Sequence, residues 1–165
     1  MLKKLAVAAV AAMVGVGVAS AADYTVKPKV TSLKTTPKTV LLVGTSFMYY
    51  NCGVNGTLSG IVKAKGGKLA STMATIGGAG LDWHDVKSFL RPNGLRSYST
   101  LNDGSNKLVF HQYKDGKVFD AVVLQDNSQG PVHPELSKFF KKYAKIHSAD
   151  IRATGAEPLF MMTWA

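Results

Sequence analysis

The sequence is short of cysteine and of acidic residues. Its single cysteine, Cys52, excludes an intrachain disulfide, so the fold must rest on its apolar core. We expect this thiol to be buried or to line a pocket, a role more common than catalysis. Only 10 acidic residues stand against 20 lysines and arginines, and this excess of positive charge favours anionic partners such as acidic glycans, lipid headgroups or nucleic acid.

The motifs of two ligand classes are also missing. No zinc-ligand spacing, recognition helix or aromatic-basic motif is present, so we expect no nucleic-acid partner. The glycine-rich stretch 77–80 is not followed by Gly-Lys-Ser/Thr and does not complete Gly-x-Gly-x-x-Gly, which argues against a phosphate-binding loop.

The one strongly apolar run lies near the start of the chain. Residues 1–22 combine a basic start, a short alanine-rich and valine-rich core and a small-residue exit, as a cleavable secretory signal does. Its core is too short for a convincing membrane span, although an uncleaved anchor is the alternative. We therefore expect a periplasmic or secreted bacterial protein without stable membrane insertion. Removing Lys3 and Lys4 lowers the formal charge from +10 to +8.

The remaining chain predicts an extended lead-in, 23–37, and one α/β domain, 38–165. Four aliphatic residues, Val40 to Val43, read as a strand covered on both faces, and this strand ends at Gly44. Ser46 should then lie at the carboxyl edge of a parallel sheet, where such sheets bind ligands. A serine in this place also commonly caps the next helix.

Two later strands end in polar or glycine-rich stretches. The strand expected over 69–76 runs into 77–80, where Gly80, with Gly78 in reserve, could present a backbone amide to a pocket. The strand expected over 119–125 is followed by Asn127. Each stretch could also be an ordinary turn.

Other elements follow from periodicity and breakers. We expect helices over 53–65, 82–90 and 134–153, an irregular insertion over 93–106, a strand over 107–113 ending in an Asp-Gly turn, and a last strand over 158–165. The second helix should carry Trp83, Val86, Phe89 and Leu90 on one side. The third should bury an apolar stripe and expose His147, whereas His133 could line the pocket and His111 should lie on an edge strand. The apolar stripe comprises Leu136, Phe139, Phe140, Tyr143 and Ile146.

The three strand ends resemble the blocks of the SGNH (GDSL-type) hydrolases. Val-Gly-Thr-Ser-Phe resembles the first block, Gly80 the second and Asn127 the third. Thr45 replaces the usual acidic residue, and Gln125 and Ser128 replace the Gly and Asp around the asparagine. With the alternation of strands and helices, the resemblance implies a three-layer α/β/α sandwich with a mainly parallel, flavodoxin-like sheet, incomplete at its carboxyl end.

The resemblance also implies a chemistry. Ser46 would be the nucleophile and one oxyanion donor, and the Gly80 amide and the Asn127 side chain the other donors, with no metal or organic cofactor. The family's final Asp-x-x-His block, which supplies the base, does not occur in these 165 residues. We therefore expect the chain to be an amino-terminal portion or a truncated relative, inactive by itself.

Two function classes remain open. The first is an exported serine esterase that hydrolyses an acyl ester, including esters on carbohydrates, through an acyl-serine intermediate. The second is an exported α/β module that binds a glycan or another anionic ligand without chemistry. A nucleotide-binding flavodoxin-like protein is disfavoured by the export signal and by the missing phosphate loop.

Overall fold

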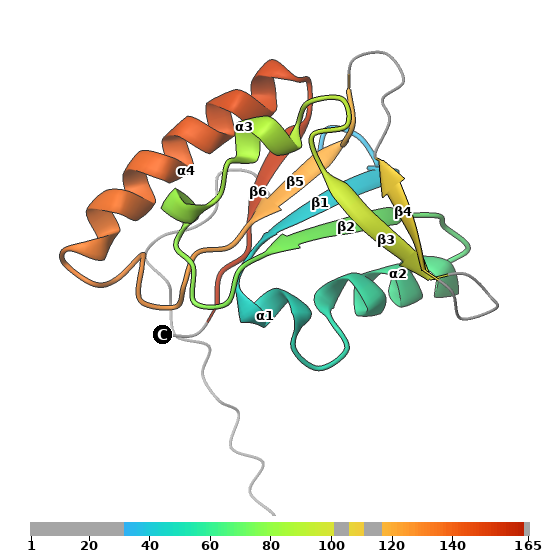
Figure 1. Ribbon diagram of the computed structural model, residues 1–165, viewed down its shortest axis with the longest axis horizontal. Helices are drawn as coiled ribbons and strands as arrows, with labels where there is room; N and C mark the ends of the chain where they lie inside the picture. Colours follow the sequence, from blue (N-terminus) through green and yellow to red (C-terminus); the bar gives the residue numbers. More distant parts are fainter. Residues whose placement is uncertain (1–31, 101–105, 111–116, 164–165) are drawn as a thin grey trace, which may run out of the picture. The chain divides into compact units, whose positions relative to one another are not determined.

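The computed structural model describes residues 32–100, 106–110 and 117–163 of the 165-residue chain. Its main sheet has the strand order β2-β1-β5-β6, and every neighbouring pair is parallel (Figure 1). This confirms the expected α/β class with a flavodoxin-like sheet. The expected signal sequence and the part of the expected lead-in up to residue 31 lie outside the described residues. The strands are β1 (Thr39–Gly44), β2 (Ala70–Thr75), β5 (Ala121–Leu124) and β6 (Glu157–Phe160).

Helices cover both faces of this sheet (Figure 1). On one face lie α1 (Ser46–Tyr49) and α2 (Val54–Ala64). The other face carries the short 3-10 helix η1 (Leu81–Trp83), α3 (Val86–Phe89) and α4 (Leu136–Ala153). Within the described residues, none of these helices is long and apolar enough to cross a bilayer.

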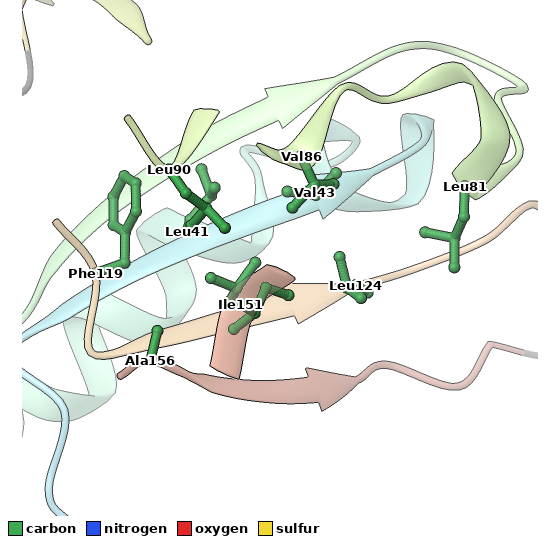
Figure 2. Close-up of a cluster of buried hydrophobic side chains, with 10 residues drawn as sticks. Leu41, Val43, Leu81, Val86, Leu90, Phe119, Leu124, Ile151 and Ala156 are labelled. Carbon is green, nitrogen blue, oxygen red and sulfur yellow. The ribbon is translucent and has the colours of Figure 1, made fainter. Parts of the chain in front are cut away.

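Strand β1 supplies side chains to both layers of the core. Leu41 and Val43 are fully buried toward α3 and α4, where Figure 2 shows them beside Val86 and Ile151. Val40 and Leu42 point to the opposite face and pack with Met48 of α1. Because successive side chains of a strand alternate between its faces, only an unbroken aliphatic run satisfies both layers.

A second, two-stranded sheet corrects the expected insertion loop. Strand β3 (Arg96–Thr100) pairs antiparallel with β4 (Asn106–Phe110), so the prediction of an irregular 93–106 segment is wrong. Strand β3 is rich in serine and threonine, and its strand character depends on pairing with β4 rather than on an apolar pattern. The expected Asp-Gly turn at 115–116 and His111 lie outside the described residues.

The helix expected over 82–90 is also interrupted. Its halves are η1 and α3, separated by His84 and by Asp85, whose side chain accepts from the Ser88 amide and caps α3. Trp83, expected on the same side as Val86 and Leu90, is 63% exposed, whereas these two residues are buried. A capping carboxylate favours a new helix start, and the break turns Trp83 away from the core.

Helix α4 ends as expected, with Gly155 at φ +80° just after it, but it buries a different face. Phe140 and Tyr143 pack against the core, whereas Leu136, Phe139 and Ile146 are exposed, so the expected stripe is only partly buried. The buried positions are instead His147, Ser148 and Ile151 in the second half of the helix. The prediction of a surface His147 is therefore wrong.

Asp120 joins the starts of β1 and β5. Its Oδ2 accepts from the Lys38 amide (2.8 Å), the Thr39 amide (3.0 Å) and the Thr39 hydroxyl (3.1 Å), and Oδ1 pairs with Lys117 Nζ at 3.0 Å. Burial alone would raise the pKa of Asp120. The hydrogen bonds from Lys117, Lys38 and Thr39 outweigh that cost and lower the pKa to about 2.

Replacing Asp120 with Asn should lower the free energy of unfolding by about 1 kcal/mol at pH 7, because hydrogen bonds to a charged, partly exposed carboxylate are lost. A carboxyl whose pKa is lower in the folded chain contributes stability above its ordinary value of 3.8. The difference between wild type and variant should therefore shrink as the pH falls from about 4 toward 2. Urea unfolding monitored by circular dichroism at each pH measures this difference in unfolding free energy.

The matched control is Asp150→Asn. No hydrogen bond or ion pair of the Asp150 side chain is recorded within the part of the chain that the structure describes. Its unfolding free energy should follow that of the wild type across this pH range. Equal behaviour of the two variants would contradict the role given to Asp120.

Candidate active site

The carboxyl ends of the parallel strands form the edge at which the candidate residues gather. In the order β2-β1-β5-β6, the chain leaves β1 toward β2 and later returns to the other side of β1 as β5. The crevice beside such a reversal is where open α/β sheets bind ligands. Figure 1 shows the segments that follow β1, β2 and β5 at the same end of the sheet.

Ser46 begins α1 immediately after β1. Thr45 is the N-cap, and its hydroxyl accepts from the Phe47 amide at 3.3 Å. The Ser46 side chain is half-buried, and no hydrogen bond of its hydroxyl is recorded within the described ranges. Its backbone amide lies in the first turn, where helical amides have no intrahelical acceptor. Both groups thus keep their hydrogen-bonding capacity for a ligand.

Gln125 ties the end of β5 to the end of β1. Its Oε1 accepts from the Thr45 amide (2.9 Å) and the Thr45 hydroxyl (3.0 Å), and both residues are buried. Its amide nitrogen donates to the Asp126 carbonyl. A methyl group at Gly44 would lie 2.6 Å from Gln125 Oε1, so only glycine leaves room for this side chain. The bond fixes the residue that precedes Ser46.

Asn127 is oriented by its own turn. Its Oδ1 accepts from the amides of Gln129 (3.1 Å) and Gly130 (2.7 Å), as asparagine commonly does in turns. With the oxygen committed, the amide nitrogen Nδ2 is left as the donor, and no acceptor for it is recorded among the described residues. The turn therefore aims a hydrogen-bond donor away from itself.

Gly80 lies beside that donor. A methyl group built on Gly80 would be 3.6 Å from Asn127 Nδ2 and 2.4 Å from Asp82 Oδ1. Gly80 is buried, and across the described segments no acceptor is recorded for its N–H. The reserve candidate, Gly78, is exposed with φ +74°. Two of the three predicted site residues, separated by 47 positions in the sequence, are thus neighbours in space.

Asp126 holds these two segments together. Its Oδ1 accepts from the Asn127 amide at 2.7 Å, and the Leu81 amide stabilises the charge of the same carboxylate without forming a regular hydrogen bond. Burial raises the pKa of Asp126, and the nearby Asp82 carboxylate adds to that effect, whereas the Asn127 and Leu81 amides oppose it. The same carboxylate therefore interacts with Asn127 and with Leu81, which follows Gly80.

Two cavities meet at Asn127. One, of about 220 Å³, includes Gly80, Asp82 and Trp83 in its wall, and the other, of about 430 Å³, lies between the start of α4 and the end of β6. Asp126 and Asn127 line both. Ser46 lines neither of the two, and no contact of Ser46 with Gly80 or Asn127 is recorded. The structure thus brings Gly80 and Asn127 together and places Ser46 on the adjoining strand end.

The described histidines do not line either of these cavities. His133 is exposed and caps α4, its Nδ1 accepting from the Glu135 amide at 3.2 Å, so it does not take the pocket position considered for it. His147 is buried, and its Nε2 lies 2.9 Å from the Leu81 carbonyl. This contact ties α4 to the segment that follows Gly80.

His84 is buried next to the end of β1. Within the described chain, neither of its ring nitrogens has a hydrogen-bond partner. Burial lowers the pKa of His84, and the nearby His147 contributes to that decrease. The Gly44 carbonyl, which faces the ring without forming a regular hydrogen bond, and the Asp82 carboxylate oppose it. His84 is therefore kept neutral beneath the site.

Sequence reasoning missed part of this arrangement and misplaced Cys52. Cys52 is exposed, with φ +69°, because it lies in the turn between α1 and α2, so the prediction of a buried thiol is wrong. Neither the Gln125 bond to Thr45 nor the role of Asp126 was predicted. The run of polar residues after β5 was the available signal. No group of three potential metal ligands occurs in the described parts of the chain.

Comparison with known proteins finds no match to this chain among family models, curated proteins or solved structures.

Replacing His84 with Leu should make the protein less sensitive to acid. Because the folded chain resists protonation of His84, the unfolded state gains protons first as the pH falls below 6.5, and wild-type stability declines. Leucine has a similar volume and no unpartnered nitrogens. We expect a stability at pH 7 within about 1 kcal/mol of the wild type or above it and a smaller loss between pH 6.5 and 5, measured by urea unfolding.

The exposed histidine provides the control. His133→Gln changes a histidine outside the core, so the part of the acid-induced loss of stability that His84 causes should remain, and adding His84→Leu to this variant should reduce the loss as it does in the wild type. If His84→Leu lost as much unfolding free energy between pH 6.5 and 5 as the wild type, another group would be the cause of the acid sensitivity.

Proposed function

We propose that this chain carries the serine and oxyanion residues of an exported ester hydrolase of the SGNH type. The observation that supports it most is the pairing of Gly80 with Asn127. Gly80 lies beside the Asn127 side-chain amide, neither the Gly80 N–H nor Asn127 Nδ2 has a recorded acceptor among the described residues, and Ser46 follows β1 at the same edge of the sheet. A carbonyl oxygen that becomes negative during acyl transfer needs such preorganised donors.

Ser46 would attack the ester carbonyl and form an acyl-serine, releasing the alcohol, and water would then release the acid. The amides of Ser46 and Gly80 and the side chain of Asn127 would hold the oxygen of the tetrahedral intermediate. Each such donor typically contributes about 3 kcal/mol. The base would be a histidine, as in the hydrolases that the sequence resembles, and none of the described histidines lines the cavities at Asn127.

Carbohydrate esters fit the smaller cavity. Trp83 is 63% exposed at its wall, and Asp82 lies beside it. An exposed aromatic face with a neighbouring hydrogen-bond acceptor suits a sugar ring and its hydroxyl groups. The same wall supports the second candidate, a module that binds a glycan without chemistry.

Replacing Ser46 with Ala should reduce hydrolysis of p-nitrophenyl acetate by the complete gene product to background, because the nucleophile is lost. A fluorophosphonate probe should label the wild type at Ser46 and leave the variant unlabelled, as peptide mass spectrometry would show. Wild-type turnover by Ser46→Ala would refute the esterase proposal. A protein that binds oligosaccharides and never reacts with the probe would support the glycan-binding module.

Asn127→Asp is the sharpest test of the oxyanion role. Aspartate keeps the oxygen that accepts from Gln129 and Gly130, so the turn is preserved, but it replaces the donor with a negatively charged acceptor. We expect kcat for p-nitrophenyl acetate to fall by about 10²- to 10³-fold while circular dichroism stays unchanged. The control is Gln129→Ala, which keeps the backbone amide that donates to Asn127, changes an exposed side chain that lines neither cavity, and should retain most of the activity. Equal activity of both variants would exclude Asn127 as a donor.

A further inference from the structure

The larger cavity at Asn127 is bounded mainly by apolar side chains. Val132 comes from the turn before α4, Phe140 from α4 itself, and Phe160 and Met161 from the end of β6. The rings of Phe140 and Phe160 meet edge to face, with centroids 6.2 Å apart. A volume of about 430 Å³ lies in the range of small-molecule sites. Such a cavity suits an alkyl group.

The position of Asn127 gives this cavity an orientation relative to an ester. Asn127 and Asp126 line both cavities, whereas the wall with Asp82 and Trp83 belongs only to the smaller one. An ester whose carbonyl oxygen accepts from Asn127 Nδ2 therefore has an apolar space on one side and a more polar space on the other. The acyl chain fits the first and a hydroxyl-bearing alcohol the second.

We propose that the cavity between the start of α4 and the end of β6 binds the acyl chain of the substrate, which makes the enzyme selective for esters of medium-length alkyl acids over acetyl esters. This inference rests on the proposed esterase function. Asp126 lies at the inner wall of the cavity, and its carboxylate favours a neutral ester over a free fatty acid at that position.

The first test is the chain-length profile of p-nitrophenyl acetate, butyrate and hexanoate with the complete gene product. A buried methylene contributes about 0.8 kcal/mol, which corresponds to roughly a fourfold gain in kcat/KM for each added methylene until the cavity is full. Equal or falling kcat/KM from acetate to hexanoate would overturn the assignment.

The second test narrows the cavity from its rim. Val132 is 65% exposed, so Val132→Trp can be accommodated without disturbing the core and should lower the hexanoate-to-acetate ratio of kcat/KM about tenfold. The control, Ile146→Trp, places the same side chain at a 42% exposed position on α4 that does not line this cavity. It should keep the wild-type ratio. An identical ratio in both variants would contradict the proposal.

A binding measurement separates failure of this inference from failure of the esterase proposal. Hexanamide, a neutral carbonyl compound, should bind the Ser46→Ala protein at least tenfold more tightly than acetamide in a calorimetric titration, and Val132→Trp should weaken that binding. If it does so while no ester is hydrolysed, the alkyl site stands and the esterase proposal fails. Hexanamide binding no tighter than acetamide would overturn the alkyl site, whatever the hydrolytic activity.

Discussion

The bond between Gln125 and Thr45 is the constraint on which the rest of the candidate site depends. It joins the carboxyl ends of β1 and β5 across the point where the strand order reverses, and it is buried at both partners. Without it, the Thr45 amide and hydroxyl would lose a buried acceptor, at a cost of about 1–3 kcal/mol. The turn that presents Ser46 and the loop that presents Asn127 therefore depend on the same side chain.

From this bond the arrangement extends through Asp126. Gln125 also donates to the Asp126 carbonyl, the Asp126 carboxylate accepts from the Asn127 amide, and the Leu81 amide stabilises the charge of that carboxylate. His147 of α4 contacts the Leu81 carbonyl. Buried polar groups are tolerated when they are bonded to one another, and such a network holds the segments around Gly80 and Asn127 in one geometry. A donor site for an oxyanion requires that fixed geometry, because its donors must be in place before charge develops.

The sequence alone predicted those elements whose limits depend on a local pattern of residues. The aliphatic run Val40 to Val43 predicted a strand buried on both faces, and Gly155 marked the end of α4. It was insufficient where partners far apart in the chain decide the outcome. Gln125 bonds to a residue 80 positions away, and His147 is buried because of a contact with Leu81, 66 positions away. A pattern of apolar spacing does not record such contacts.

The candidate site also has features that the sequence predicted and features that only the structure shows. Strand ends predicted that Ser46, Gly80 and Asn127 share one edge of the sheet, and the structure places Gly80 beside Asn127. In the structure, Asn127 Oδ1 accepts from the amides of Gln129 and Gly130, and this identifies Nδ2 as the atom that can donate to a ligand. This orientation depends on backbone dihedral angles after β5, which residue types alone do not specify.

The most direct test of whether Ser46, Gly80 and Asn127 bind one oxygen is an NMR comparison of the complete, isotope-labelled gene product before and after phosphonylation of Ser46. The phosphonyl oxygen then stands in for the oxyanion, and we expect the amide proton of Gly80 and the side-chain amide protons of Asn127 to move downfield on modification. Phosphonylated Ser46 with both sets of signals unchanged would contradict it, because the three residues would then not share one oxygen.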